Sequence, residues 1–129
     1  MSNTVGRGFA WILGVLAATQ AVAHHGAGVF GPDKKMRVMG TVKGFQFLNP
    51  HVLVYIDVKG DDGKPVHWGG ELTSPNRLAR AAGTVKWHNG ILKPGDQITI
   101  TGHPARNGAP MMDILKIVDG QGTVLIDDE

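Results

Sequence analysis

Two consecutive histidines, His24 and His25, directly follow the tripeptide Ala21-Val22-Ala23. Small residues at positions 21 and 23 form the pattern that signal peptidase recognises, and cleavage after Ala23 makes His24 the first residue of the mature chain. An N-terminal histidine offers two metal-binding nitrogens in one chelate, its α-amine and its imidazole. The sequence therefore predicts a transition-metal site at the mature N-terminus.

The segment before these histidines has the other parts of a secretory signal. Arg7 lies in a short n-region, and an apolar run extends from Phe9 to Ala18. This run is shorter than the roughly 20 residues that a membrane span needs. We therefore expect residues 1–23 to be a cleaved signal peptide, and the mature protein to be periplasmic or secreted, with no membrane attachment.

Two further candidate ligands, His51 and Glu71, lie on a predicted hairpin. Residues 51–58 are rich in β-branched side chains, residues 60–63 (Gly-Asp-Asp-Gly) form a turn, and residues 65–72 return. Alternation turns Val52, Val54 and Ile56 inward together with Val66, Trp68 and Gly70. In the predicted register His51 lies across from Glu71, and Tyr55 lies across from His67, all on the outer face.

These residues define a specific coordination hypothesis. His24 would supply two nitrogens and His51 or His25 a third, while Glu71 would be an oxygen ligand or would orient an imidazole. Such a donor set suits Cu(II) and Zn(II), and the Irving–Williams order favours copper, with zinc as the alternative. It is similar to the histidine brace of copper monooxygenases and periplasmic copper carriers, a likeness that rests on His24 alone.

Chain length permits the two ends of this site to meet. Residues 24–35 are rich in glycine and read as an extended arm. The part from His25 to Lys35 could span roughly 35 Å when extended. The arm is therefore long enough to fold back toward His51.

Other functions compete with this hypothesis. The histidine pair could be a solvated chain end, leaving a metal-free binding module for a protein, peptide or glycan that depends on Tyr55 or Trp87. A haem-binding protein is a third alternative, without a supporting motif. Four methionines are expected to pack in the core or at sheet edges: Met36, Met39, Met111 and Met112. Ligation of Cu(I) is the alternative role for them. We expect surface or loop roles for His67, His88 and His103.

Composition narrows the function classes further. The chain has no cysteine, which excludes disulfides, thiolate catalysis and zinc fingers. Its 13 basic and 11 acidic residues are scattered, so no basic stripe predicts a nucleic-acid partner. Ser74 is the single serine after the signal and reads as a helix cap, and no hydrolase, P-loop or H-E-x-x-H motif is present. We expect metal binding or delivery, with a periplasmic protein as recipient, rather than catalysis.

The predicted elements form one small domain over residues 36–129. The first strand, residues 36–47, bends near Gly40 and Gly44, and the hairpin of residues 51–72 follows. Ser74 and Pro75 begin a helix over residues 76–82 that Gly83 ends. Strands over residues 97–102 and 112–118 follow, with a last short hairpin at residue 119. This order is typical of a mainly β, five-stranded OB-like barrel with one short helix between strands three and four; a five-stranded meander is the alternative.

Several motifs occur in an order that resembles a known family. They are Ala23-His24-His25-Gly26, Gly40-Thr41-Val42, Asn49-Pro50-His51, Glu71-Leu72-Thr73-Ser74-Pro75 and Leu92-Lys93-Pro94-Gly95-Asp96. Together they resemble a family of small exported bacterial proteins classed as a domain of unknown function. The resemblance implies export and a single β-barrel domain, and it carries no established catalytic residue. The family's glycine–tryptophan pair after the helix is absent, because Gly83 and Trp87 are separated here.

Overall fold

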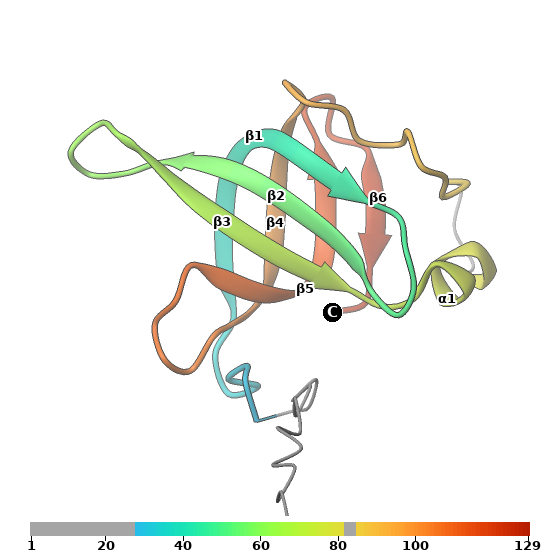
Figure 1. The fold of residues 1–129 in the computed structure, drawn as a ribbon, viewed down its shortest axis with the longest axis horizontal. Coiled ribbons are helices and arrows are strands. Elements are labelled where there is room, and N and C mark those ends of the chain that lie inside the picture. The colour runs from blue at the N-terminus through green and yellow to red at the C-terminus, as the bar shows by residue number, and fades with distance from the viewer. Residues whose placement is uncertain (1–27, 82–84) are drawn as a thin grey trace, which may run out of the picture.

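Alternating apolar and polar residues, interrupted by turn sequences, produce the strands of this protein. The computed structural model describes residues 28–81 and 85–129 (Figure 1). The elements in chain order are β1 (Met36–Gln46), β2 (Val52–Lys59), β3 (Pro65–Leu72), α1 (Pro75–Arg80), β4 (Gln97–Pro104), β5 (Met111–Asp119) and β6 (Val124–Asp127). The last hairpin predicted from the sequence is thus a sixth strand.

The strands close into a barrel. Their order is β3-β2-β1-β4-β5-β6, and a parallel pairing of β3 with β5 joins the two sides of the sheet. β6 pairs with the second half of β5 outside the closed ring of five strands. The predicted class is confirmed: the fold is a mainly β, OB-like barrel of five strands with one short helix between β3 and β4.

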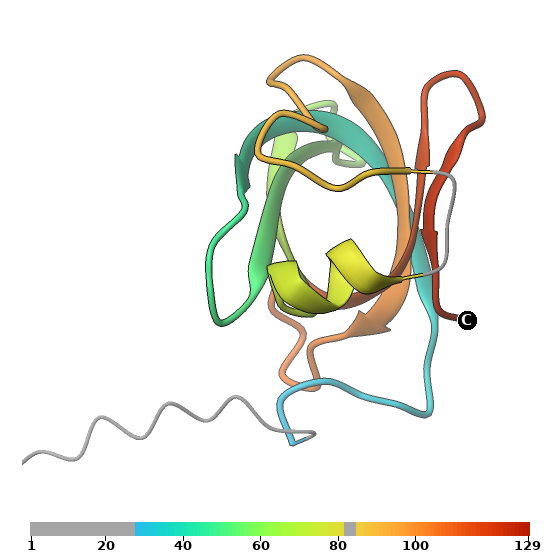
Figure 2. The ribbon, with the colours of Figure 1, turned by 90° about the vertical axis from the view of Figure 1, so that its right-hand side faces the viewer.

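The short helix α1 closes one end of the barrel. Ser74 caps it, since its Oγ accepts a hydrogen bond from the backbone N–H of Arg77, and Pro75 occupies the first helical turn as predicted. Figure 2 shows α1 across the barrel opening, where Leu78 joins the core with 1% of its surface exposed. The predicted end of the helix at residues 82 and 83 lies outside the described residues.

The core consists of the inward-facing side chains of the five barrel strands. Val52, Val54 and Ile56 are buried as predicted, and Trp68 and Gly70 lie on the same inner side. Val66 is the exception with 40% exposure, because the end of the hairpin extends beyond the core. No helix within the described residues has the length and apolar character needed to cross a membrane.

The hairpin register differs from the prediction by two residues. Leu53 pairs with Glu71, Tyr55 with Gly69 and Asp57 with His67, so His51 and Tyr55 do not lie directly across from Glu71 and His67. The reason is the turn. Gly60 pairs with Lys64 around a three-residue loop in which Gly63 has a φ of 79°. A shift of two residues preserves the side-chain alternation, and the two faces of the hairpin therefore keep their predicted residues.

A β-bulge interrupts the pairing of β1 with β2, and another interrupts the pairing of β4 with β5. In β1 the register with β2 shifts between Val42 and Gly44, close to the predicted bend. In β4 the register with β5 shifts between Thr101 and Gly102. A Cβ atom at Gly102 would lie 2.0 Å from the carbonyl oxygen of Asp113, so β4 and β5 approach too closely at this point for any side chain.

Candidate functional site

The structure brings His51 and Glu71 into contact. His51 precedes β2 and Glu71 lies on β3, and Nδ1 of His51 is 2.9 Å from Oε1 of Glu71. The same nitrogen lies 3.2 Å from the carbonyl oxygen of Leu72. The two residues predicted from the sequence therefore meet, although through a diagonal contact and not through the predicted strand pairing.

Two residues that the sequence analysis did not select extend this contact into a row. Glu71 pairs with Asp113 across the parallel β3–β5 ladder, and Asp113 pairs with His103 across β4 and β5. Directly paired residues present their side chains on one face of a sheet. Glu71, Asp113 and His103 thus lie side by side, with His51 at the Glu71 end; we call these four residues the outer row.

Hydrogen bonds fix the ring nitrogens of both histidines in the same way. Nδ1 of His51 lies near two oxygen acceptors, the carbonyl oxygen of Leu72 and Oε1 of Glu71, and Nδ1 of His103 lies 2.9 Å from the carbonyl oxygen of Lys34. Each Nδ1 must carry a proton to donate these bonds, so the lone pair of each neutral ring is on Nε2. A carboxylate or carbonyl that holds the distal N–H is the usual support of a metal-binding histidine.

The carboxyl of Asp113 has a raised pKa in the folded protein. Burial raises the pKa of its carboxyl above the ordinary value of 3.8, and the negative charge of Glu71 also raises the pKa, while His103 and His51 lower it. The three other members of the outer row are therefore close enough to influence the ionisation of Asp113.

The N-terminal arm runs along the His103 side of the outer row. Phe30 forms a β-bridge with Ala105, and the backbone N–H of Gly31 donates to the carbonyl oxygen of Pro104. Arg106 reinforces this pairing because its Nε donates to the carbonyl oxygen of Phe30. The arm of the described chain therefore continues the sheet next to β4, directly beside His103.

The proposed ligands divide between the described and the undescribed parts of the chain. His24 and His25 lie outside the described residues. Within residues 28–81 and 85–129, no group of three or more His, Cys, Asp or Glu side chains has the arrangement to hold a metal ion. The outer row is therefore not a metal site by itself.

The other histidines of the described chain have different surroundings. His67 is exposed and its Nδ1 contacts Oδ1 of Asp57, on the same outer face of the hairpin but outside the outer row. The backbone N–H of Gly90 donates to Nδ1 of His88, which leaves the proton of that ring on Nε2. His88 is thus fixed in the opposite tautomer to His51 and His103.

The exposed aromatic residue of the sheet is Tyr55, not Trp87. Trp87 is 9% exposed and packs against Phe45, with ring centroids 6.4 Å apart, so it belongs to the core. Tyr55 is 39% exposed, and the backbones of Gly44 and Gly69 flank its ring. Met112 is buried, whereas Met36, Met39 and Met111 are exposed.

The chain belongs to a family of unknown function, DUF6152, whose family model matches residues 13–112. This confirms the resemblance that the motifs indicated. No curated protein matches the chain in sequence.

Comparison with solved structures gives a fold likeness only. A crystal structure of Rim1, the mitochondrial single-stranded DNA-binding protein of S. cerevisiae, matches with a TM-score of 0.46 and 12% sequence identity. The match covers 73% of this chain and 95% of the other.

Proposed function

We propose that this protein is exported and binds a transition metal, copper in the first place and zinc as the alternative, for binding or delivery. The N-terminal His24 would supply its amine and imidazole, with His25 as an alternative ligand. His51 would supply Nε2, and Glu71 would hold the His51 ring through Nδ1. His103 and Asp113 extend the donor set along the outer row.

The observation that carries this proposal is the position of Nδ1 of His51, which lies against both Oε1 of Glu71 and the carbonyl oxygen of Leu72. A ring whose Nδ1–H is held by a carboxylate presents a basic Nε2 in a fixed direction, which lowers the cost of ordering the ligand when a metal binds. The same arrangement at His103 gives a second oriented nitrogen on the same face.

Chain reach is compatible with the N-terminal histidines completing the site. His24 lies four positions before Gly28, the first described residue, and an extended segment of that length spans about 14 Å. Three strand spacings of the sheet, the distance from the arm across β4 and β5 to β3, are also about 14 Å.

Calorimetric titration of the exported protein with Cu(II) tests the proposal. The N-terminus of the purified protein is first determined by mass spectrometry. A terminus at His24 and one stoichiometric tight site are the expected results, with the site lost in His24→Ala and weakened in His51→Ala. Protons compete for amine and imidazole nitrogens, so the affinity should fall as the pH drops below about 6.

His88→Ala is the matched control, since it removes an exposed histidine in the opposite tautomer. A terminus elsewhere, or an affinity that is the same in the His24→Ala, His51→Ala and His88→Ala variants, would refute the proposal.

A metal-free peptide-binding module is the second candidate, and the exposed patch around Tyr55 favours it. Tyr55, Gly69 and Met111 are neighbours across β2, β3 and β5, and Tyr55 and Met111 are 39% and 43% exposed. An exposed aromatic ring beside a methionine can pack against apolar side chains of a peptide. This function predicts partner binding that is sensitive to Tyr55→Ala and indifferent to His24→Ala.

A further inference from the structure

Two asparagines of this chain directly precede a glycine in exposed loops. Asn89-Gly90 belongs to the loop before β4, and Asn107-Gly108 belongs to the loop between β4 and β5. Both asparagines are exposed. Because glycine has no Cβ, its backbone nitrogen can approach the side-chain carbonyl of the preceding asparagine closely. The two pairs therefore share the same intrinsic chemistry, and the surroundings of each glycine nitrogen distinguish them.

The reaction open to such a pair is deamidation through a cyclic imide. The glycine nitrogen attacks the side-chain carbonyl carbon of asparagine, a new C–N bond closes a five-membered ring, and the C–N bond to the side-chain amino group breaks. The amino group leaves as ammonia with the hydrogen that the glycine nitrogen has lost. Water then opens the ring at either carbonyl and yields aspartate or isoaspartate. A backbone N–H is a very weak acid, so a base positioned on it accelerates ring closure.

His88 places such a base on the attacking nitrogen of the first pair. The backbone N–H of Gly90 is shared between two acceptors of His88, Nδ1 at 3.1 Å and the carbonyl oxygen at 2.8 Å. The ring lies alongside the glycine, since a Cβ atom on Gly90 would be 3.5 Å from Nδ1. Nδ1 accepts this hydrogen bond with its lone pair, and Nε2 carries the proton of the neutral ring. The ring can therefore take the proton of Gly90 and return it to the leaving amino group.

At the second pair a carbonyl oxygen takes the place of the base. The N–H of Gly108 donates to the carbonyl oxygen of Ala105 at 3.1 Å. A peptide carbonyl accepts a hydrogen bond but does not take up a proton near neutral pH. Oδ1 of Asn107 accepts from the backbone N–H of Ala109 at 3.0 Å, which holds this side chain in an Asx turn. Asn107-Gly108 is therefore a matched reference site within the same molecule.

We propose that Asn89 is a site of spontaneous modification in which His88 is the catalytic base. The product is aspartate or isoaspartate at position 89, formed with loss of ammonia and uptake of water. The reaction needs no metal and uses no residue of the outer row. It is therefore independent of the proposed function.

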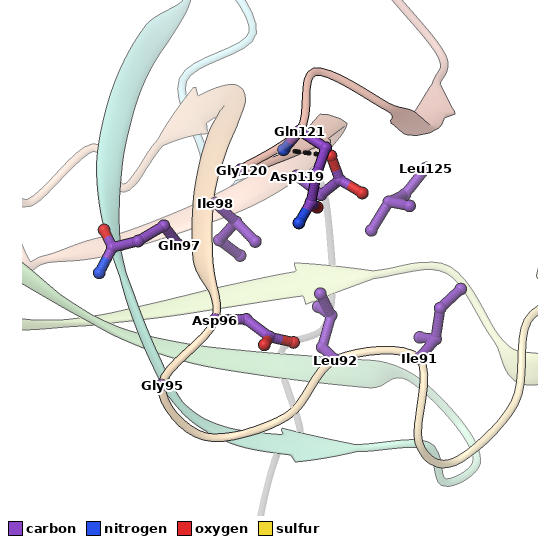
Figure 3. A pocket seen from close by; sticks show the side chains of 10 residues that line it. All are labelled: Ile91, Leu92, Gly95, Asp96, Gln97, Ile98, Asp119, Gly120, Gln121 and Leu125. Atoms are coloured by element: carbon purple, nitrogen blue, oxygen red, sulfur yellow. Dashed lines mark hydrogen bonds between the residues drawn. The ribbon is translucent and has the colours of Figure 1, made fainter.

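The loop that contains Asn89 connects two buried parts of the core. Trp87 precedes the pair and is 9% exposed, and Leu92 follows it and is 4% exposed. Figure 3 shows the side chains of Ile91 and Leu92 on the side of the loop that faces Leu125. Isoaspartate adds an extra atom to the backbone between Trp87 and Leu92. The isoaspartate form should therefore unfold at a lower temperature than the unmodified protein.

Timed incubation of the metal-free protein in water enriched in heavy oxygen tests the proposal. Tryptic digestion in ordinary water then separates the two asparagines into the peptides of residues 87–106 and 107–116. Mass spectrometry of heavy-oxygen incorporation measures only the deamidation that occurs during the incubation. We expect Asn89 to react about tenfold faster than Asn107, a smaller factor than in enclosed active sites because water competes for the exposed ring.

The decisive variant is His88→Asn. The asparagine side-chain oxygen can still accept the N–H of Gly90 but cannot take its proton, so the rate at Asn89 should fall about tenfold. The rate at Asn107 should stay the same. His67→Asn is the control, because it removes another exposed histidine and should leave both rates unchanged.

Incubation in guanidinium chloride separates the folded geometry from the local sequence. In the unfolded chain the ring of His88 is no longer fixed on Gly90, and the rates at the two asparagines should converge. The proposal is overturned if Asn89 and Asn107 react equally fast in the folded protein or if His88→Asn leaves the rate at Asn89 unchanged. A difference between the two sites that persists in the unfolded chain would overturn it as well.

Discussion

Nδ1 of His51 lies 2.9 Å from Oε1 of Glu71, although the two residues are not paired in the β2–β3 ladder. His51 lies just before β2, and its ring turns back toward β3, where it also approaches the carbonyl oxygen of Leu72. The orientation of the ring is therefore determined by groups on the neighbouring strand, and the function of His51 should depend on Glu71.

Substitution of Glu71 tests that dependence. In Glu71→Gln the charged acceptor of the His51 N–H is lost while the side-chain size is kept, and we expect the affinity for Cu(II) to fall about 10- to 100-fold. Calorimetric titration measures the change. Asp57→Asn is the control, because Asp57 contacts His67 on the same hairpin. An equal loss in both variants would contradict an orienting role of Glu71.

Asp113 should make the stability of the metal-free protein depend on pH. Burial raises the pKa of its carboxyl in the folded state, so the folded protein holds this proton more tightly than the unfolded chain does. The stabilisation is complete below the ordinary value of 3.8 and is lost as the pH rises through the folded-state pKa. Urea unfolding of the wild type and of Asp113→Asn at several pH values measures the effect. The free-energy difference between the two proteins should shift in favour of Asp113→Asn as the pH rises, and a constant difference would disprove the assignment.

Because β4 and β5 approach closely at Gly102, adding one methyl group there should strongly destabilise the protein. In Gly102→Ala the new Cβ would collide with the backbone of Asp113, and we expect the free energy of unfolding to fall by about 3 kcal/mol or more. Gly69→Ala is the matched control on β3, which pairs with β5 as β4 does, since its Cβ would meet Met111 at an ordinary 3.9 Å. Chemical denaturation compares the two variants, and equal stabilities would show that β4 can move away.

Trp87 and Tyr55, the two aromatic residues of the alternative binding hypothesis, should contribute very different amounts to the stability of the protein. Trp87 is buried against Phe45, so Trp87→Ala should cost about 3–5 kcal/mol. Tyr55 is exposed, and Tyr55→Ala should cost less than about 1 kcal/mol. Thermal unfolding followed by circular dichroism measures both. A larger loss for Tyr55→Ala would mean that its ring supports the sheet and is not available to a partner.

Local sequence patterns were sufficient to predict the fold class and most of the strands. Alternation defined β2 and β3, Ser74 and Pro75 defined the start of α1, and turn sequences separated β4 from β5. The hairpin register was wrong because a three-residue loop around Gly63 replaces the assumed turn, and that choice depends on backbone geometry.

The candidate site was predicted only in part. His51 and Glu71 lie on the same hairpin, so their proximity followed from its faces. Asp113 and His103 join them through the β3–β5 pairing and the bulge at Gly102, which bring together residues far apart in the sequence. Alternation in β5, where Asp113 stands between buried Met112 and Ile114, was the local signal that could have marked Asp113 as outward-facing.

The short parallel ladder between β3 and β5 has one further consequence. It contains three residue pairs, and Glu71 with Asp113 is one of them. A ligand that binds both His51–Glu71 and Asp113–His103 would therefore hold β3 and β5 together along the seam, that is, the β3–β5 pairing that closes the barrel. Such a ligand binds only the closed chain, and it would stabilise the seam in proportion to the logarithm of its concentration. Hydrogen exchange of the Gly69 amide, which donates across this seam to Pro110, would report the closure directly.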